Sequence, residues 1–500
     1  MRVAAALESQ GAKARPILEP LVRLGPPPAE AEGEHDELVH EQKKTFLVED
    51  STGLKAEAIE LPPTEVQAHA RLEDLSAIRS ALKSGEIPVV APLALDSFHR
   101  MVRVDSNHVV AALVRSMVQA GQALQQKKDS IAATNAHEDS TEMPERSMPE
   151  DEVDLTPLRL MIINKEGGVP SYARQGLPHL LINLSSEHSH IVRTFSPTWS
   201  SSHPTSLANL TLSRTCLEYM PPSSSAIVVS HKSPRSLIGN LVTNKPAQSS
   251  SLPAYLLTTG SKAVTPHTPT LIRKGVPIRV IQRDRMHEID RDKMNKLLEA
   301  SFRRTLKADE FYERMDKVLD YVIIAGNYAG ACIITEEPIP NSTGGRRSLS
   351  YLDKFAVHPS HQGDGTVDFL WVALHDESFG CGLAHALNPN QGGKMGLGTG
   401  RDLVWRSRTN NPANRWYYER SSGHLRLGEK GEWTMFWCDA EERLKQKEVE
   451  MVEKGWEGAK YVPGRRGRQV EGLSFCEEGE EGRLDEWRDV VAAIPSCWAP

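Results

Sequence analysis

The sequence predicts an α/β chain whose second half holds a mixed α+β domain, and three observations carry that prediction. A helix, a strand and a helix follow one another between Leu72 and Met117, which is typical of a parallel α/β layer. A hairpin is expected where two apolar runs, 321–325 and 331–335, flank a Gly-containing turn. Between Leu349 and Val357 residues alternate as in a strand, and a Gly-rich turn and a helical pattern follow.

The composition bounds the function classes. The chain has 500 residues, 39% hydrophobic and 25% charged, which fits a soluble protein of two to four domains. A net charge of −7 argues against a nucleic-acid partner, and no apolar run reaches about 18 residues, so no membrane span is expected. Six scattered cysteines without a C-x-x-C pair indicate free thiols in a reducing compartment and no metal site. Arg2, Lys13 and Arg15 are interrupted by Glu8, so no clear transit peptide is evident.

The first half is predicted to be an α/β region, residues 1–283, that carries polar insertions. Two stretches, about 127–157 and 185–206, are acidic or rich in Ser, Pro and His, and we expect them to be disordered. The remaining elements expected here are a short helix and strand in 2–18, a loop in 25–41, a strand at 46–48, a helix in 72–82, a strand in 87–92, a turn and a helix in 102–117, strands at 158–164 and 179–184, a helix in 207–220, a strand at 226–230, a loop in 233–253 and a strand or linker at 278–281.

The second domain is expected to span 284–442. Helices are predicted over 290–302 and 311–319 from their apolar spacing, ahead of the hairpin. A Gly-rich insertion occupies 380–400, and a strand is expected over Leu403–Arg408. The tail, 443–500, alternates in charge and is expected to be partly helical or disordered. A fragment of 284–442 should therefore fold alone.

Gln362, Gly363, Asp364 and Gly365 form the most informative turn, because it joins the strand to a helix. Such a turn presents backbone N–H groups and the positive end of the helix dipole to a phosphate. We therefore expect these residues to bind the pyrophosphate of a cofactor, although two glycines also occur in plain turns. Asp364 adds an unfavourable negative charge at this place.

Lys354 comes before that turn, and Arg406 and Arg408 supply further cations on a later strand. Arg406 and Arg408 lie on one face of the same strand, and an arginine fork pairs bidentately with a carboxylate. Asn411 is placed to cap the next helix, with Pro412 as its first residue. These cations suit a dicarboxylate substrate; the alternative interpretation is a solvated strand surface and a simple helix cap.

The order of these motifs resembles a known family, the fungal N-acetylglutamate synthases, whose acetyltransferase domain has the GNAT-type fold. The resemblance rests on Tyr-Leu-Asp-Lys-Phe at 351–355, Gln-Gly-Asp-Gly at 362–365, Trp-Arg-Ser-Arg at 405–408, Asn-Pro at 411–412, Trp-Tyr at 416–417 and Trp-Thr-Met-Phe-Trp at 433–437. It implies acetyl transfer from acetyl-CoA to L-glutamate, the first step of arginine biosynthesis, in the mitochondrial matrix.

The resemblance also implies roles for particular residues. Lys354, Arg406, Arg408 and Asn411 would form the glutamate site, and the backbone of Phe355, Ala356 and Val357 would line the acetyl thioester. Tyr417 would lie near the thioester sulfur, where a phenol can protonate a leaving thiolate. Its alternative is an aromatic residue that only packs the helix. The side chains of Trp416, Phe355, Trp433 and Phe436 are expected in the core.

The region before 284 resembles the amino-acid kinase fold that precedes the acetyltransferase in this family. Ile87–Pro92, Arg103–Asn107 and Pro269–Pro277 carry that resemblance, the last as a final helix and turn. No glycine- and lysine-bearing phosphate turn precedes Ile87, and Asn107 stands where such kinases have Asp, so the domain is expected to be incomplete and without kinase activity. Arginine as a feedback effector, an N-acetylglutamate kinase partner and a homo-oligomer are implied.

A second hypothesis belongs to another class of protein. The incomplete kinase-like half and the insertions would also suit a non-catalytic regulatory or scaffold subunit that binds arginine or a partner biosynthetic enzyme. Release of thiol from acetyl-CoA in the presence of glutamate would separate an enzyme from such a subunit.

Overall fold

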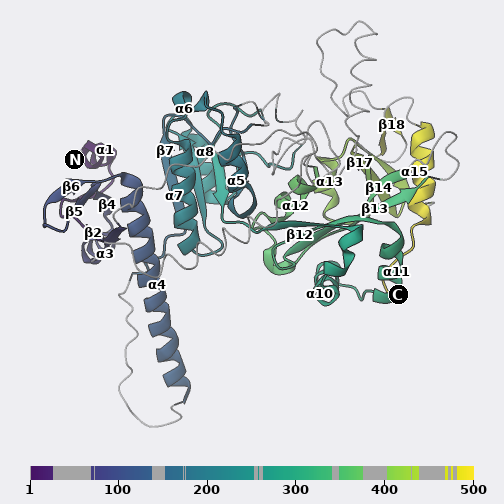
Figure 1. The fold of residues 1–500 in the computed structure, drawn as a ribbon, viewed down its shortest axis with the longest axis horizontal. Coiled ribbons are helices and arrows are strands. Elements are labelled where there is room, and N and C mark those ends of the chain that lie inside the picture. Colours follow the sequence, from purple (N-terminus) through teal and green to yellow (C-terminus); the bar gives the residue numbers. More distant parts are fainter. Residues whose placement is uncertain are drawn as a thin grey trace, which may run out of the picture. The chain divides into compact units, whose positions relative to one another are not determined.

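The computed structural model describes most of the chain as helices, strands and their connections. The described residues are 2–25, 69–72, 74–137, 153–172, 174, 176–252, 257, 263–339, 348–375, 402–428, 431–438, 468–470, 474–476 and 481–499. The predicted strand at 46–48 and the Gly-rich insertion at 380–400 lie outside them. The chain divides into two compact units, one of residues 1–158 with 218–221 and one of residues 159–217 with 222–500 (Figure 1).

The first unit contains short strands and the long helix α4. Its four-stranded sheet has the order β3-β2-β5-β6, and β1 pairs with β4 in parallel. The bounds are α1 Arg2–Ser9, β1 Ala14–Ile17, β2 Val22–Gly25, β3 His69–Leu72, α3 Ser76–Lys83, β4 Ile87–Val90, β5 Leu93–Leu95, β6 Met101–Arg103 and α4 Ser106–His137. The predicted helix over 102–117 continues to His137, into the stretch expected to be disordered, because no proline interrupts it before Pro144.

The second unit begins with a four-stranded sheet of order β7-β9-β10-β8. β7 is parallel to β9 and β10 to β8, whereas β9 and β10 are antiparallel. The bounds are β7 Arg159–Asn164, β8 Leu181–Asn183, α5 Leu184–Thr194, α6 Trp199–Ser202, α7 Ser206–Tyr219, β9 Ser225–Ser230, α8 Pro234–Thr243 and β10 Thr270–Arg273. The predicted helix over 207–220 and the strand over 226–230 are confirmed.

Three predictions for this region were wrong. The stretch 185–206 contains most of α5 and all of α6. The buried face of α5 includes the polar residues Glu187 and His190, so apolar spacing does not indicate this helix. Residues 233–253 contain α8, with Pro234 at its first turn. The final helix expected within 269–277 is the strand β10, buried at all its positions.

The largest element of the second unit is a nine-stranded sheet of order β11-β12-β13-β14-β15-β17-β16-β19-β18. Only β14 and β15 pair in parallel within it. The strands are β11 Ile278–Gln282, β12 Leu319–Ala325, β13 Gly330–Pro338, β14 Ser348–Val357, β15 Leu403–Arg408, β16 Gly423–Leu427, β17 Trp433–Cys438, β18 Arg468–Val470 and β19 Ser474–Cys476. The predicted hairpin and the strands at Tyr351 and Leu403 are confirmed.

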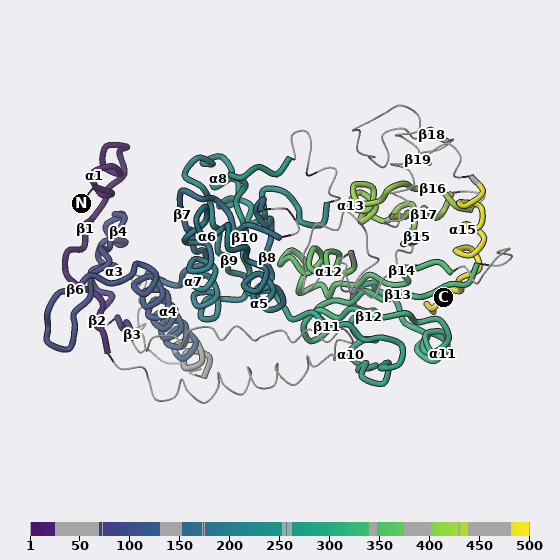
Figure 2. Tube along the Cα trace, turned by 45° about the horizontal axis from the view of Figure 1, so that its top comes forward, coloured from purple at the N-terminus to yellow at the C-terminus, as the bar shows by residue number. Residues whose placement is uncertain are grey.

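Helices cover both faces of this sheet. They are η2 Arg283–Glu288, α10 Arg291–Phe302, α11 Ala308–Val318, η3 Pro359–His361, α12 Thr366–His375, α13 Asn414–Tyr418 and α15 Glu481–Ala493. The cluster around Trp371 and Tyr417 places α12 and α13 on one face, whereas the clusters of α10, α11 and α15 contain strand residues of the opposite face. Figure 2 shows α12 on one side of the strands and α10 and α11 on the other.

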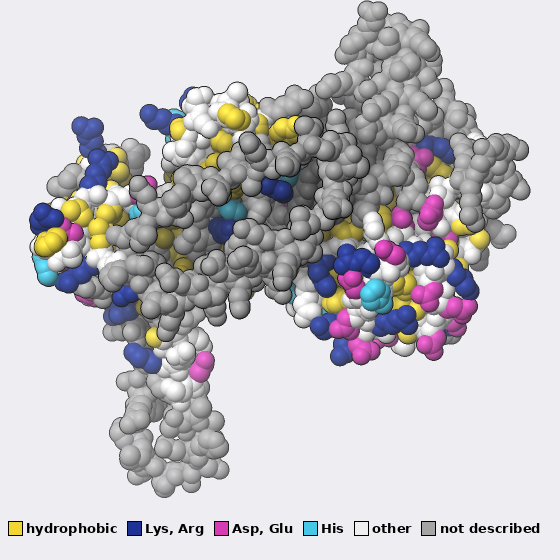
Figure 3. Space-filling model, viewed as in Figure 1, with side chains coloured by type: hydrophobic (Ala, Val, Ile, Leu, Met, Phe, Trp, Pro, Cys, Tyr) yellow, Lys and Arg dark blue, Asp and Glu magenta, His cyan; other side chains and the backbone are white. Residues whose placement is uncertain are grey.

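The outer surface of α10 and α11 carries side chains of both charge signs, interspersed as Figure 3 shows. Several are paired within one helical turn, among them Lys293 with Asp290 at 3.4 Å and Lys317 with Glu313 at 2.7 Å. Asp290 also accepts a hydrogen bond from the amide of Lys293 and so caps α10. These charged side chains pair with neighbours on the solvent-facing side of the helices, and the apolar side chains of the opposite sides pack in the core.

Both predicted boundaries of this domain need correction. β11 pairs with β12 along its whole length, so the sheet begins before residue 284. At the other end, α15 lies within the predicted charged tail and packs Leu484, Trp487 and Val491 against the sheet. Their helical spacing is diluted by many charged neighbours, which explains why composition alone pointed to a tail.

Candidate functional site

The central feature of the sheet is an opening between β14 and β15. The two strands pair only at Ser350 with Leu403 and at Tyr351 with Val404. Beyond these positions β14 continues to Val357 beside β13, and β15 continues to Arg408 beside β17. The facing edges therefore separate inside the sheet, and backbone groups along them are available to a ligand.

A β-bulge at Asp353 shapes one edge of the opening. Ile334 pairs with Leu352 and Ile333 with Lys354, so Asp353 is the extra residue. Lys354 is buried and forms an ion pair with Asp353. Its ammonium lies 5.6 Å from the ring centroid of Phe311 and 5.9 Å from that of Trp498. Lys354 therefore faces α11 and the C-terminal segment.

The Lys354 ammonium belongs to a buried charge cluster that sequence reasoning missed. Arg314 donates to Asp353 at 2.9 Å and pairs with Glu337, which also accepts from Thr335 at 2.7 Å. Burial alone would raise the pKa of Asp353, but the charges of Lys354 and Arg314 outweigh it and lower that pKa. Asp353 is thus ionised and orients Lys354. The only sequence signal was its position between Tyr351 and Lys354.

The turn before α12 has the backbone geometry expected of an anion site. Gly363 and Gly365 have φ values of +92° and +100°, which other residues rarely adopt, and a Cβ on Gly363 would meet open space. α12 begins immediately afterwards at Thr366. Asp364 accepts from the amide of Thr366 at 2.9 Å and contacts His361 Nδ1 at 2.9 Å. Both of its carboxylate oxygens are therefore bonded within the turn.

Tyr417 lies in an aromatic cluster on the α12 and α13 face. Its ring centroid is 5.4 Å from that of Trp405 and 5.5 Å from that of Phe436. Phe355 joins the same cluster by stacking on Trp416 at 5.9 Å. Burial raises the pKa of the Tyr417 phenol well above its ordinary value, so the hydroxyl keeps its proton. Tyr417 therefore presents a protonated hydroxyl within the aromatic cluster.

The two arginines of β15 have different surroundings. Arg406 donates to the carbonyl oxygens of Val491 at 2.6 Å and Ile494 at 2.7 Å, at the end of α15. Arg408 is exposed and lines an open groove of about 790 Å³ with Thr409, Asn410, Glu432 and Trp433. Arg406 therefore holds the C-terminal helix, whereas Arg408 is accessible to a solute.

Asn411 does not cap the helix as predicted. α13 begins at Asn414, and the Asn411 side chain instead accepts from the amide of Ala413 at 3.0 Å and donates to Ser407 at 2.8 Å. It closes the turn that follows β15. A proline after an asparagine suits such a turn as well as a helix start, so the local sequence did not distinguish them.

The predicted residues fall into two groups on opposite faces of the sheet. Phe355, Val357 and Tyr417 belong to the α12 and α13 face. Lys354 contacts α11, and Arg406 and Arg408 alternate with Trp405, which belongs to the Tyr417 cluster. The opening between β14 and β15 is the place where a ligand on one face can meet a ligand on the other.

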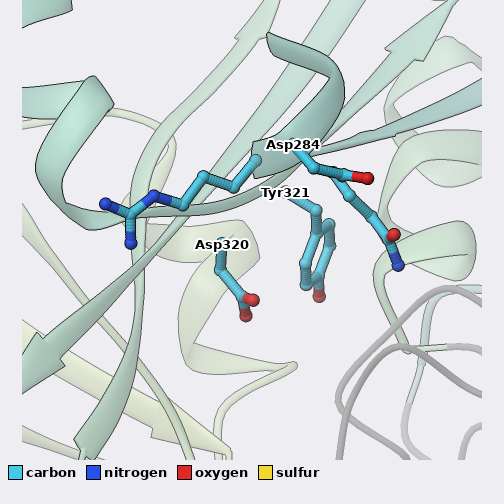
Figure 4. A pocket seen from close by; sticks show the side chains of 5 residues that line it. Asp284, Asp320 and Tyr321 are labelled. Atoms are coloured by element: carbon cyan, nitrogen blue, oxygen red, sulfur yellow. The ribbon is translucent and has the colours of Figure 1, made fainter.

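A second pocket, of about 520 Å³, lies at the edge strand β11 and its neighbour β12. It is lined by Gln282, Arg283, Asp284, Asp320 and Tyr321. Figure 4 shows Asp320 and Tyr321 projecting to the same side, which fits the register shift between Leu319 and Tyr321. It contains none of the predicted site residues.

Among the residues that the structure describes, no group of three His, Cys, Asp or Glu side chains could hold a metal ion. Within that same part of the chain, every helix is too short or too polar to cross a bilayer.

Comparison with known proteins connects this site to a family. The family described as NAT, N-acetyltransferase, of N-acetylglutamate synthase matches residues 281–387 and 398–454. An amino-acid acetyltransferase of Coprinopsis cinerea is 54% identical over 100% of this chain and 70% of its own length. That of Laccaria bicolor is 52% identical over 100% of this chain and 75% of its length. Both carry the designation mitochondrial.

A solved N-acetylglutamate synthase of Neisseria gonorrhoeae aligns with 88% of this chain and 76% of its own, at 13% identity and a TM-score of 0.39. The high identity over the full chain settles the relationship: the chain belongs to the fungal amino-acid acetyltransferases, and their N-acetyltransferase domain covers the strands of the nine-stranded sheet from β12 to β17.

Proposed function

We propose that this chain transfers the acetyl group of acetyl-CoA to the amino group of L-glutamate, giving N-acetyl-L-glutamate and CoA. The observation that carries the proposal is the opening between β14 and β15, with Tyr417 on one face and Lys354 on the other. Membership in the amino-acid acetyltransferases supports the reaction class. The non-catalytic alternative is not favoured, because the relatives are named as enzymes.

Acetyl-CoA would bind on the α12 face. The amides of Gln362, Gly363, Asp364 and Gly365 and the first turn of α12 would hold its pyrophosphate. Hydrogen bonds from the amide and hydroxyl of Thr366 and a contact with His361 engage the Asp364 carboxylate within the turn, which weakens its repulsion of the phosphates. The thioester would then lie along Phe355, Ala356 and Val357, where backbone N–H groups can polarise the carbonyl oxygen.

L-Glutamate would bind on the opposite face, with Lys354 and Arg408 as carboxylate partners. We retain Arg406 only as a support for α15, because its guanidinium is engaged by two carbonyl groups. Asn411 would contribute by fixing the turn next to Arg408. Arginine and lysine differ here: the exposed fork of Arg408 can bind bidentately, whereas Lys354 is a buried point charge.

The chemistry follows from holding the two substrates together. The neutral amine attacks the acetyl carbonyl, a C–N bond forms, and the C–S bond then breaks. The thiolate takes the proton of Tyr417, and the amine loses its extra proton to water, which later restores the phenol. Positioning supplies much of the rate, and the phenol supplies general-acid assistance.

Residues 1–283 would form an incomplete amino-acid kinase-like domain, ahead of the acetyltransferase domain, and would tune activity through arginine as a feedback effector. A homo-oligomer and an N-acetylglutamate kinase partner are proposed on the family resemblance alone. The mitochondrial designation of the relatives supports the same location for this chain.

A thiol-release assay across the amino acids tests the proposed function. With acetyl-CoA present, L-glutamate should give the fastest CoA release, and mass spectrometry should find N-acetylglutamate in equal amount. Aspartate and glutamine serve as matched controls, because each changes only the chain length or one carboxylate. Equal rates with all three, or none with glutamate, would contradict the proposal.

A further inference from the structure

A hydrogen-bond network outside the predicted site joins α12 to a preceding segment of the chain. Asp368 lies in the first turn of α12, directly after the glycine turn. Its Oδ1 accepts hydrogen bonds from Ser249 Oγ at 3.0 Å and Ser251 Oγ at 2.5 Å. The two serine hydroxyls are 2.8 Å apart. Both serines come from the loop between α8 and β10, more than a hundred residues earlier in the chain.

The same serines bind Arg420, which follows α13. Arg420 is buried, and it donates from Nε to Ser251 Oγ at 2.8 Å and from Nη2 to Ser249 Oγ at 3.0 Å. Its remaining nitrogen, Nη1, donates to the carbonyl oxygen of Trp416 at 3.1 Å. The guanidinium carbon lies 4.0 Å from the ring centroid of Trp416. Arg420 therefore fixes the residue directly before Tyr417.

The network connects the two elements on which acetyl transfer would depend. The Asp368 carboxylate of α12 and the Arg420 guanidinium, which follows α13, are joined through the hydroxyl groups of Ser249 and Ser251. Each serine accepts from the arginine and donates to the aspartate, so each hydroxyl satisfies both charges at once. Removing one member would take hydrogen bonds from the others, although Arg420 would keep the Trp416 carbonyl at 3.1 Å and Glu419 at 3.4 Å. The members that remain can replace the lost bonds only by moving.

Another contact from the preceding sheet reaches the same turn. Arg273 of β10 is buried, and its Cδ atom lies 3.6 Å from the position that a Cβ on Gly365 would occupy. Its guanidinium donates to the carbonyl of Asn244 at 2.9 Å. The region before the acetyltransferase sheet thus abuts the turn as well as both helices.

We propose that Arg420 and Asp368 are positioning residues, which through Ser249 and Ser251 fix Tyr417 relative to the pyrophosphate turn. This inference rests on the proposed function. It makes the segment 249–251 a required part of the acetyltransferase site. Lys354 and Arg408 lie on the other face of the sheet, so the network sets the geometry of thioester cleavage rather than the affinity for glutamate.

Four variants test the network: Arg420→Lys, Asp368→Asn, the double variant Ser249→Ala with Ser251→Ala, and Arg415→Lys as control. Arg415 lies exposed on the same helix α13. A lysine keeps the charge of Arg420 but cannot reach three acceptors. Because displacement of a reacting group by about 1 Å can cost a hundredfold in rate, we expect kcat to fall by about tenfold to a hundredfold, with the KM for glutamate within about twofold.

A double-mutant cycle separates positioning from simple structural support. If Arg420 acts by placing Tyr417, then Arg420→Lys should change kcat little further in a Tyr417→Phe background. A structural role alone would give additive losses, and such additivity would overturn the inference. An unchanged kcat in Arg420→Lys and in the double serine variant would overturn it equally.

A binding measurement keeps this inference distinct from the proposed function. CoA affinity, measured by calorimetry, should fall in Asp368→Asn and stay unchanged in Arg415→Lys, whichever amino acid is acetylated. Failure of wild-type turnover with glutamate would contradict the proposed function alone. Wild-type CoA affinity in Asp368→Asn would show that the network does not support the turn.

Discussion

Replacing Arg406 by methionine should cost stability, whereas glutamate binding should be retained. Methionine keeps much of the aliphatic stem and removes the guanidinium. That group caps the end of α15 through the carbonyls of Val491 and Ile494, and it lies 5.0 Å from the Trp433 ring. A cation at a helix C-terminus is stabilising because it meets unpaired carbonyl groups and the negative end of the dipole.

The magnitude follows from these contacts. A hydrogen bond to a charged group contributes about 1.5–3 kcal/mol, so two such bonds set an upper range of about 3–6 kcal/mol. Arg406 is only half-buried, and the freed carbonyls can reach water, which lowers the loss. We expect the free energy of unfolding to fall by about 2–4 kcal/mol. The substitution would weaken the attachment of α15, whose residues Leu484 and Trp487 are buried.

Two measurements test this prediction. Denaturant unfolding followed by tryptophan fluorescence gives the free energy of unfolding, and steady-state kinetics give the KM for glutamate. Arg408→Met is the matched control, because Arg408 lies two residues along the same strand and is exposed. It should leave stability nearly unchanged but raise the KM for glutamate by about tenfold to a hundredfold, since it removes a charge-assisted pair worth about 1.5–3 kcal/mol. The reverse pattern, with Arg406→Met stable and weak in glutamate binding, would refute the reasoning.

Three further expectations concern the rest of the site. Gly365→Val should weaken CoA binding in calorimetry, because φ is +100° and the new Cβ would approach Phe369 to 3.3 Å; full affinity would place the phosphates elsewhere. Tyr417→Phe should lower kcat by about a hundredfold or more with little change in either KM, and unchanged turnover would remove the phenol from the reaction. Contrary to the expectation from the sequence, a fragment of 284–442 should lack a cooperative thermal transition, because it omits β11 and α15; a folded, active fragment would contradict this.

Local patterns were sufficient wherever neighbouring residues determine the structure. The alternation along β14, the glycine turn and the apolar spacing of α12 gave the right elements, because strand, turn and helix signals each span only a few residues. The same reasoning failed for α5, whose buried face contains Glu187 and His190. It also failed for α15. The apolar side chains of this helix are separated by charged residues, and their common face is evident only from their packing against the sheet.

The arginines of β15 show why the site could not be assigned in full. Arg406 and Arg408 are both arginines on the same face of one strand, with nearly the same neighbours. Local sequence therefore predicts both of them equally as carboxylate ligands. What separates them is a helix end about 85 residues later, whose carbonyls engage only Arg406. Lys354 illustrates the complementary case. Its ion pair with Asp353 depends on a bulge that no spacing rule predicts, because adjacent strand residues ordinarily point to opposite faces. The surroundings of each cation in the motif are therefore set by contacts with other parts of the fold, which local spacing does not show.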